Sequence, residues 1–189
     1  TADNVDADIW TVGADAASVL TAEQIQQAII EKIADAGDSI IPPVGQTFTL
    51  TTGVDTPVLS ANNDTITGVA SALTAENTLN TTDVIDGLGG VDTLKVDLKS
   101  NFTGFTTAGK LANVENIELT NSGTIGRNFD ATGVTGAQKY VLNAGESSIS
   151  LSNLAAAGIA ADAVGQKSGT ATVGFTTKAV EGTADALTV

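Results

Sequence analysis

Residues 83–96 read DVIDGLGGVDTLKV, which joins an acidic approach, a glycine-rich turn and the start of a strand. Glycines such as Gly87 and Gly89 allow backbone conformations that turn carbonyl oxygens inward. Asp92 then places a carboxylate where the turn becomes a strand, and Leu94, two residues later, points into a core. The stretch therefore predicts a turn that closes one coil of a stacked β-structure.

A similar turn lies upstream, in GVDTPVLSANNDTITG at residues 53–68. It contains Asp55 and the pair Asn63-Asp64, again followed by threonine and an aliphatic residue. The parallel between NDTITG and VDTLKV predicts two neighbouring coils, with Asp64 and Asp92 near the same edge.

Both turns offer the oxygen ligands that calcium prefers. Asp83 and Asp86 add carboxylates on the approach to the second turn, where few cations are available to balance them. Two stacked turns of this kind form an oxygen cage for an ion that takes about six to eight ligands. The candidate calcium ligands are Asp55, Asn63, Asp64, Asp83, Asp86, Gly87, Gly89 and Asp92. An alternative stays open, in which these are ordinary Asx turns held by side-chain-to-backbone hydrogen bonds.

From Gln46 onward, short β-branched runs alternate with Gly, Asn and Asp turns. The runs expected to be strands are 47–52, 64–69, 92–98, 113–120, 138–143, 147–152 and 170–177. Similar strands end near Leu98, Leu119 and Leu142, a recurrence of 21 to 23 residues. That period fits one coil of a β-solenoid, although an antiparallel sandwich with similar spacing remains an alternative. The Ala-rich run 153–164 is the one place in this region where a short helix is expected.

A helix is expected at 21–36, before the β region. Thr21 and Gln24 form a capping-box pattern, apolar residues recur at helical spacing, and Gly37 and Pro42 end the pattern. The predicted fold class is thus mainly β, with β-solenoid or β-roll-like rungs preceded by a short helical segment. The domains are 1–41, the tail of a helical N-terminal domain, and 46–189, a calcium-binding β-solenoid-like region. Because the chain begins at Thr1 without a hydrophobic leader, we expect an excerpt of a longer protein.

Composition excludes several classes of function. With 22 acidic and 8 basic residues, the net charge of −14 repels nucleic acid. The absence of Cys and His removes disulfides, thiolate or imidazole metal sites and the Ser-His-Asp triad. No apolar run approaches the roughly 18 residues of a membrane span. We therefore expect a protein that is not an enzyme and has no membrane span.

Several motifs together resemble a known family. The turn at 87–94 matches the repeat-in-toxin nonapeptide G-G-x-G-x-D-x-L-x, with Leu88 where the second Gly is expected. QTFTLTTGVD at 46–55, LANVENIELTNSG at 111–123 and FDATGVTGAQKYVLNAG at 129–145 are similar to the β region of bacterial surface-layer proteins. The resemblance covers about 46 to 152.

This resemblance implies type I secretion, calcium-dependent folding and self-assembly into a two-dimensional lattice on the bacterial cell surface. The implied partners are copies of the same protein and, through the N-terminal region, a cell-surface polysaccharide or lipopolysaccharide. An alternative is the accessory β-roll of a secreted hydrolase or adhesin. A glycan-binding module is a further alternative, but its usual aromatic contacts are limited to Trp10 and Tyr140, and Tyr140 is expected in the core.

Overall fold

Parallel strand pairing organises the part of the chain that the computed structural model describes, residues 44–181. The helix expected at 21–36 and the helical-domain tail expected at 1–41 lie outside the described residues. The same holds for 182–189, at the end of the expected β region. All that follows concerns residues 44–181.

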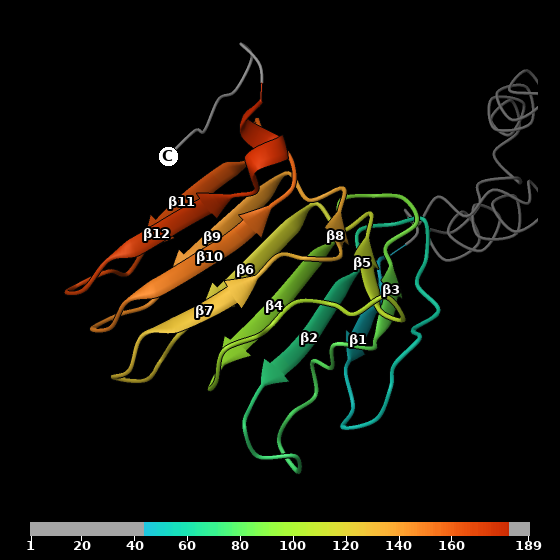
Figure 1. Cartoon of the computed structure of the whole chain (residues 1–189). Coiled ribbons are helices and arrows are strands. Elements are labelled where there is room, and N and C mark those ends of the chain that lie inside the picture. Colours follow the sequence, from blue (N-terminus) through green and yellow to red (C-terminus); the bar gives the residue numbers. More distant parts are fainter. Residues whose placement is uncertain (1–43, 182–189) are drawn as a thin grey trace, which may run out of the picture. The chain divides into compact units, whose positions relative to one another are not determined.

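Three parallel sheets form the fold (Figure 1). The long sheet contains β1 (Thr47–Thr49), β2 (Thr65–Ala70), β4 (Thr93–Leu98), β6 (Asn116–Thr120), β9 (Lys139–Asn143) and β11 (Ala160–Val164). The second sheet contains β3 (Val84–Asp86), β5 (Lys110–Ala112) and β8 (Val134–Thr135). The third contains β7 (Arg127–Asp130), β10 (Ile149–Leu154) and β12 (Ala171–Phe175), and the 3-10 helix η1 (Thr177–Val180) follows.

The chain visits these sheets in turn and thereby forms coils. β6, β7 and β8 follow one another along the chain, one from each sheet, before β9 returns to the long sheet beside β6. Repetition of this path produces a β-solenoid of about four turns. The prediction of a mainly β, solenoid-like fold is confirmed, and the antiparallel sandwich is excluded because every strand pair is parallel.

The register of the long sheet gives the length of each coil. Thr65 pairs with Thr93, Thr93 with Asn116, Asn116 with Lys139 and Lys139 with Ala160, which gives steps of 28, 23, 23 and 21 residues. The period expected from the sequence therefore holds in the later coils. The first of these coils is longer by two residues between β2 and β3 and by three in the turn between β3 and β4.

The expected strand ends are confirmed, since β4 ends at Leu98, β6 at Thr120 and β9 at Asn143. The register adds that Leu119 pairs with Leu142 of β9 and with Val96 of β4, and not with Leu98. Both Val96 and Leu98 point inward from β4 and are buried, so the sequence pattern alone could not distinguish them.

Alternation along each strand builds the core. Every second residue points inward, and pairing aligns these residues into a column of Ile66, Leu94, Ile117, Tyr140 and Ala161, all buried. Tyr140 is a core residue, as expected, and its burial raises the pKa of its hydroxyl. Between the sheets, Phe102 packs on Phe129 at 5.0 Å and edge-to-face on Phe105 at 5.1 Å, measured between ring centroids.

The Ala-rich run at 153–164 is not a helix, contrary to expectation. β10 continues to Leu154, and β11 pairs with β9 so that Ala161 stacks on Tyr140. Asn153 at φ 59° and Gly158 at φ 76° interrupt the helical backbone. The helical propensity of alanine is overridden here by parallel pairing with the preceding coil.

Candidate metal-binding corner

An acidic residue precedes each of three neighbouring strands in the long sheet. Asp64 lies before β2, Asp92 before β4 and Glu115 before β6, so they occupy the same corner in successive coils. The backbone nitrogen of Asp64 donates to Oδ1 of Asp92 at 2.7 Å, and that of Asp92 donates to Oε2 of Glu115 at 2.8 Å. These three residues are called the acid column below. The carboxylates of Asp92 and Glu115 thus each accept a hydrogen bond from a backbone N–H of the preceding coil, at a point where the strands have not yet begun to pair.

Asp64 is the most completely satisfied member of the acid column. Its carboxylate accepts hydrogen bonds from the backbone nitrogens of Gln46 (2.5 Å) and Ser60 (2.7 Å) and from Oγ of Ser60 (2.8 Å). Burial raises the pKa of Asp64, but these hydrogen bonds outweigh burial and leave the pKa below its usual value. Asp64 therefore carries a stabilised negative charge.

Asp92 differs from Asp64 because its environment disfavours the charged form of its carboxyl group. It is fully buried, and its Oδ2 atom accepts no hydrogen bond from any described residue. Burial raises the pKa of Asp92, the hydrogen bond from Asp64 N offsets this in part, and the charges of Asp64 and Glu115 raise the pKa further. A buried carboxylate oxygen without a partner is costly and points either to a bound proton or to a cation.

Close backbone stacking surrounds this oxygen. The space beside the α-carbon of Gly87 is bounded by Oδ2 of Asp92 and the carbonyl oxygen of Asn113, which a Cβ at residue 87 would approach to 2.3 and 1.9 Å. The amide of Gly87 donates to the carbonyl of Ala112 at 2.9 Å. Only glycine fits here, and it brings a carboxylate oxygen and a carbonyl oxygen to the same point of the corner.

The rest of the turn stacks on the preceding coil. Val91 N donates to Oδ1 of Asn63 at 2.8 Å, whereas Gly89 has no atom closer than 3.9 Å to the position of a Cβ. Leu88 has a φ of 66° and a largely exposed side chain. A leucine in this left-handed region is strained, and it stands where the nonapeptide pattern has glycine.

Asp86 lies at the surface end of β3. Its Oδ1 accepts from Nδ2 of Asn113 at 2.7 Å and its Oδ2 from Nζ of Lys110 at 3.0 Å. These two hydrogen bonds, with a third from Leu88 N, lower the pKa of Asp86. Its oxygens are thus occupied by neighbours from the next coil.

Asp55 and Asp83 occupy a different corner, at the start of β3. Asp83 is fully buried and accepts from the backbone nitrogens of Asp55 at 2.9 Å and Asn80 at 2.7 Å, while Asp55 accepts from Thr51 N at 2.7 Å. Burial raises the pKa of Asp83, the two backbone hydrogen bonds offset this in part, and the charge of Asp55 raises the pKa further. The structure thus builds a second stacked acid pair and does not direct Asp83 toward Asp92.

The expected ligands are therefore divided between two corners. Asn63, Asp64, Asp86, Gly87, Gly89 and Asp92 surround the turn before β4, whereas Asp55 and Asp83 lie before β3. Within residues 44–181, no three acidic side chains converge closely enough to hold a metal ion by themselves. A cation at the first corner would depend on Asp92 together with backbone oxygens.

Two contributors to this corner were not expected from the sequence, Glu115 and Asn113. Aligning VENIE with VDTLK before their strands places Glu115 opposite Asp92, and that alignment was the available signal. The carbonyl of Asn113, whose φ is 53°, had no comparable signal because it acts through its backbone.

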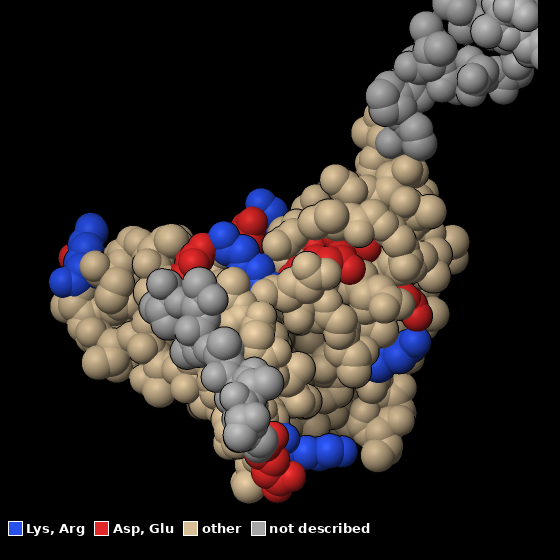
Figure 2. Space-filling model, turned by 90° about the horizontal axis from the view of Figure 1, so that it is seen from above, with Lys and Arg blue, Asp and Glu red and all other residues tan. Residues whose placement is uncertain are grey.

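Basic residues are dispersed among the acidic ones on the outside of the solenoid. Lys95 pairs with Glu118 at 3.1 Å and Lys99 with Glu76 at 3.1 Å, each across neighbouring coils or loops. Figure 2 shows the same arrangement on one face, where blue side chains lie beside red ones. The unpaired oxygen of Asp92 is thus a feature of the interior, distinct from the mixed surface.

The fold and this corner define a parallel β-solenoid with stacked acidic corners. Comparison of the chain with protein-family models, with curated proteins and with solved structures finds no match. Among residues 44–181, no helix is long and apolar enough to cross a membrane.

Proposed function

We propose that this chain is a non-catalytic, structural segment of a secreted bacterial surface-layer protein that binds calcium and contributes to a two-dimensional lattice of copies of itself. The observation that carries the proposal is the unbroken parallel register from β1 to β11, in which each coil supports the next. Such a stack is suited to spanning distance and presenting repeated surfaces.

Calcium is proposed at the corner before β4. Asp92 supplies a buried carboxylate oxygen with no hydrogen-bond donor among the described residues, and the carbonyl of Asn113 faces the same Gly87 position. An oxygen-only set of this kind suits a hard cation, and a bound cation would offset the repulsion between Asp64, Asp92 and Glu115. Because Gly87 fills the space between these oxygens, the turn at 87–91 would open slightly to admit the ion.

Calorimetric titration with calcium chloride tests this site directly. The wild-type protein should bind calcium with measurable heat. It should also unfold at a higher temperature in calcium than in chelator, because only the folded corner binds the ion. Asp92→Asn should weaken binding at least about tenfold, since it removes a ligand charge. Asp162→Asn, on the outer end of the long sheet, is the matched control and should bind as the wild type does. Equal unfolding temperatures in calcium and chelator would contradict the calcium proposal.

The surface-layer role is tested on the full-length parent protein. Electron microscopy should show ordered sheets in calcium and dispersed particles in chelator. The alternative, an accessory β-roll of a secreted hydrolase or adhesin, predicts single particles under both conditions. Retained sheets in chelator would keep the structural role and remove calcium from the assembly step.

A further inference from the structure

The loop between β2 and β3 is an elaboration of one coil. The step from Thr65 to Thr93 is 28 residues, whereas the step from Thr93 to Asn116 is 23, so this coil carries five additional residues. A structural role alone does not require them, because the following coils close without them. Two of the five lie between β2 and β3, because Thr65 to Val84 spans 19 residues whereas the paired step from Thr93 to Lys110 spans 17; the other three lie in the turn before β4. The loop at 71–82 lies at the surface of the solenoid.

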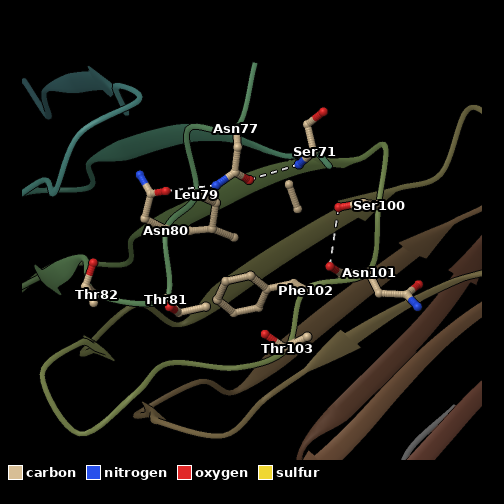
Figure 3. A pocket seen from close by; sticks show the side chains of 11 residues that line it. Ser71, Asn77, Leu79, Asn80, Thr81, Thr82, Ser100, Asn101, Phe102 and Thr103 are labelled. Atoms are coloured by element: carbon tan, nitrogen blue, oxygen red, sulfur yellow. Dashed lines mark hydrogen bonds between the residues drawn. The ribbon is translucent and has the colours of Figure 1, made fainter. Parts of the chain in front are cut away.

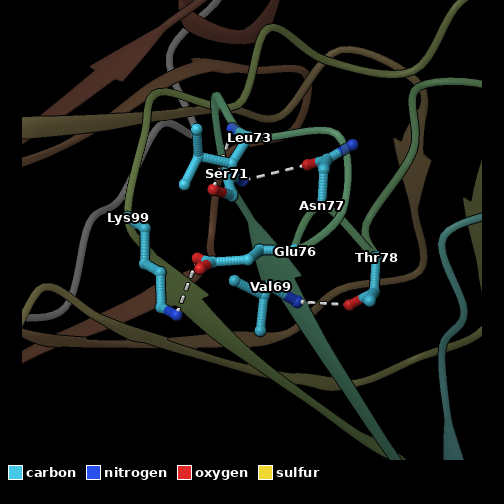
Figure 4. A network of polar contacts seen from close by, with 7 residues as sticks. All are labelled: Val69, Ser71, Leu73, Glu76, Asn77, Thr78 and Lys99. Atoms are coloured by element: carbon cyan, nitrogen blue, oxygen red, sulfur yellow. Dashed lines mark hydrogen bonds and ion pairs between the residues drawn. The ribbon is translucent and has the colours of Figure 1, made fainter.

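Hydrogen bonds hold this loop in one conformation (Figure 4). Oδ1 of Asn77 accepts from Ser71 N at 2.9 Å, and Oγ1 of Thr78 accepts from Val69 N at 2.8 Å. Glu76 also forms an ion pair with Lys99 of the next coil, at 3.1 Å. The loop is therefore pre-organised by its own contacts and by the neighbouring coil, without any ligand.

A polar pocket of about 250 Å³ lies between this loop and the next coil (Figure 3). It is lined by Ala70, Ser71, Asn77, Leu79, Asn80, Thr81, Thr82, Ser100, Asn101, Phe102 and Thr103. The volume exceeds the roughly 30 Å³ share of one water molecule several times and falls just below that of typical small-molecule sites. It is large enough for one small ring.

Some polar side chains of the lining are hydrogen-bonded within the protein, whereas others remain free to bind a ligand. The amides of Asn77 and Asn80 are used in the structure, since Asn77 Nδ2 donates to Asn80 Oδ1 at 2.8 Å. By contrast, the hydroxyls of Thr82 and Thr103 have no hydrogen-bond partner within residues 44–181, and Asn101 uses only its Oδ1, at 3.0 Å from Asn128 N. Donors and acceptors on the wall therefore remain open to a ligand.

The chemistry of the lining restricts the ligand. None of the eleven lining residues is charged, which disfavours metal ions, phosphates and carboxylates. The apolar members, including Leu79 and Phe102, are buried beneath the polar wall and offer little surface to a lipid. Hydroxyl and amide groups match a neutral ligand that carries several hydroxyls of its own.

We propose that this pocket binds a neutral carbohydrate, with one sugar ring between the loop 71–82 and residues 100–103. The hydroxyls of Thr82 and Thr103 and the free amide nitrogen of Asn101 exchange hydrogen bonds with ring hydroxyls. The site shares no residue with the acid column, and it depends neither on calcium nor on lattice formation. It differs from aromatic-platform glycan sites because the described aromatic rings nearest to it are core residues.

Nuclear magnetic resonance titration of the 15N-labelled chain with maltotetraose and with chitotetraose tests the proposal. At least one of these neutral probes should bind with a dissociation constant on the order of millimolar and shift amides of residues 79–82 and 100–103. Tetragalacturonate, a charged oligosaccharide of equal length, should bind at least about tenfold more weakly, because no cation lines the pocket. Equal or tighter binding of tetragalacturonate at these amides overturns the assignment of a neutral ligand.

Two isosteric variants locate the binding groups. Thr82→Val and Thr103→Val should each weaken binding about three- to tenfold, the range expected for one lost hydrogen bond. Thr124→Val, in the exposed loop before β7, is the control and should bind as the wild type does. Thr103 is exposed, so Thr103→Val leaves the fold intact and is decisive even if Thr82→Val unfolds. Absence of shifts with both neutral probes at about 20 mM, or unchanged affinity in Thr103→Val and in any folded Thr82→Val, overturns the proposal.

Discussion

The corner before the long sheet is built differently in the early and late coils. Before β2, β4 and β6 it carries Asp64, Asp92 and Glu115. The carboxylates of Asp92 and Glu115 accept backbone hydrogen bonds from the preceding coil. Before β9 and β11 the equivalent residues are Gln138 and Ile159. The backbone bond into the next strand is the same in both regions, since Thr93 N donates to Asp64 O and Ala160 N to Gln138 O, both at 2.9 Å. What differs is the nitrogen of the corner residue, because Gln138 N donates to the backbone oxygen of Glu115 at 2.9 Å and not to a carboxylate.

This difference shows that the coil does not need acids in order to close. A buried Ile159 and backbone hydrogen bonds serve the same geometry without the electrostatic cost of burying charge. The acid column is therefore a local specialisation of the early coils, in agreement with a role in cation binding. The following variants examine this contrast, from the largest expected effect to the smallest.

Gly87→Ala should be the most disruptive change at the acidic corner. Its Cβ would lie 1.9 Å from the carbonyl oxygen of Asn113 and 2.3 Å from Oδ2 of Asp92, so the stacked coils must separate. We expect a loss of about 3 kcal/mol in the free energy of unfolding, measured by urea denaturation.

Gly89→Ala is the matched control, because Gly89 lies in the same turn and has no positive φ. No atom lies closer than 3.9 Å to the position that a Cβ at residue 89 would occupy. It should change the free energy of unfolding by less than about 0.5 kcal/mol, or stabilise slightly by restricting the unfolded chain. Similar losses in both variants would show that the turn tolerates no side chain at all, and that the stacking at Gly87 is not special.

Asp64→Asn and Asp92→Asn should have opposite effects at neutral pH in chelator. Asp64→Asn loses charge-assisted hydrogen bonds from Gln46 and Ser60 and should destabilise by about 1–2 kcal/mol. Asp92→Asn removes a buried charge, keeps an oxygen for Asp64 N, and places its amide near the Asn113 carbonyl, so it should be neutral or stabilising by up to about 1 kcal/mol.

The pH dependence separates the two carboxylates further. The lowered pKa of Asp64 means that its stabilisation is present above the unfolded pKa of about 3.9 and is lost as the pH falls through its folded pKa. The raised pKa of Asp92 means that its charge costs stability at neutral pH and that this cost disappears as the pH falls toward about 3.9. Urea denaturation of both variants and wild type between pH 3 and pH 7, on the order of half-unit steps, measures this. Parallel pH profiles for the two variants would refute the assignment of opposite roles.

Leu88→Gly should stabilise the acidic corner by about 1 kcal/mol. The variant removes the strain of a leucine at φ 66°, and the exposed side chain contributes little burial in return. Val91→Gly, in the same turn but without a positive φ, should instead destabilise because glycine gains more freedom in the unfolded chain. Thermal unfolding of both proteins distinguishes these outcomes, and a destabilised Leu88→Gly would mean that Leu88 makes a contact that outweighs its strain.

Removal of an outer ion pair should have the smallest effect. Lys95→Met breaks the pair with Glu118, at 3.1 Å, whose two side chains are about half exposed. We expect less than about 0.5 kcal/mol, and less still in high salt. Lys139→Met, which breaks the pair with Asp162 in the late coils, should behave alike. A loss above about 1 kcal/mol in only one of them would show that the early and late coils also differ on their outer face.

Parts of this fold and site could be read from the sequence because their signals are local. The alternation in DTLKVDL and the turn glycines before it predicted β4, and the likeness of NDTITG to VDTLKV predicted that Asp64 and Asp92 stack. The strands β3, β5, β7, β8 and β11 were not predicted, because their sequences VID, KLA, RNFD, VT and AADAV lack a run of alternating β-branched and polar residues. The Ala-rich run 153–164, which contains β11, favoured a helix, the wrong structure.

The sequence by itself determined a mainly β fold, since β-branched alternation between Gly, Asn and Asp turns predicts short strands. The recurrence near 23 residues favoured stacked coils, and the parallel pairing of the strands decided against the antiparallel sandwich. The sequence also determined the available chemistry, because a chain without Cys or His can offer only oxygen ligands from its side chains to a metal. Only the tertiary structure decided which carboxylates meet. Register between residues 23 to 28 apart set Asp83 against Asp55 in one corner and Asp92 between Asp64 and Glu115 in another. A shift of a few residues would have changed those pairs while leaving every local pattern intact, because strand pairing is a long-range contact that no single stretch of sequence contains.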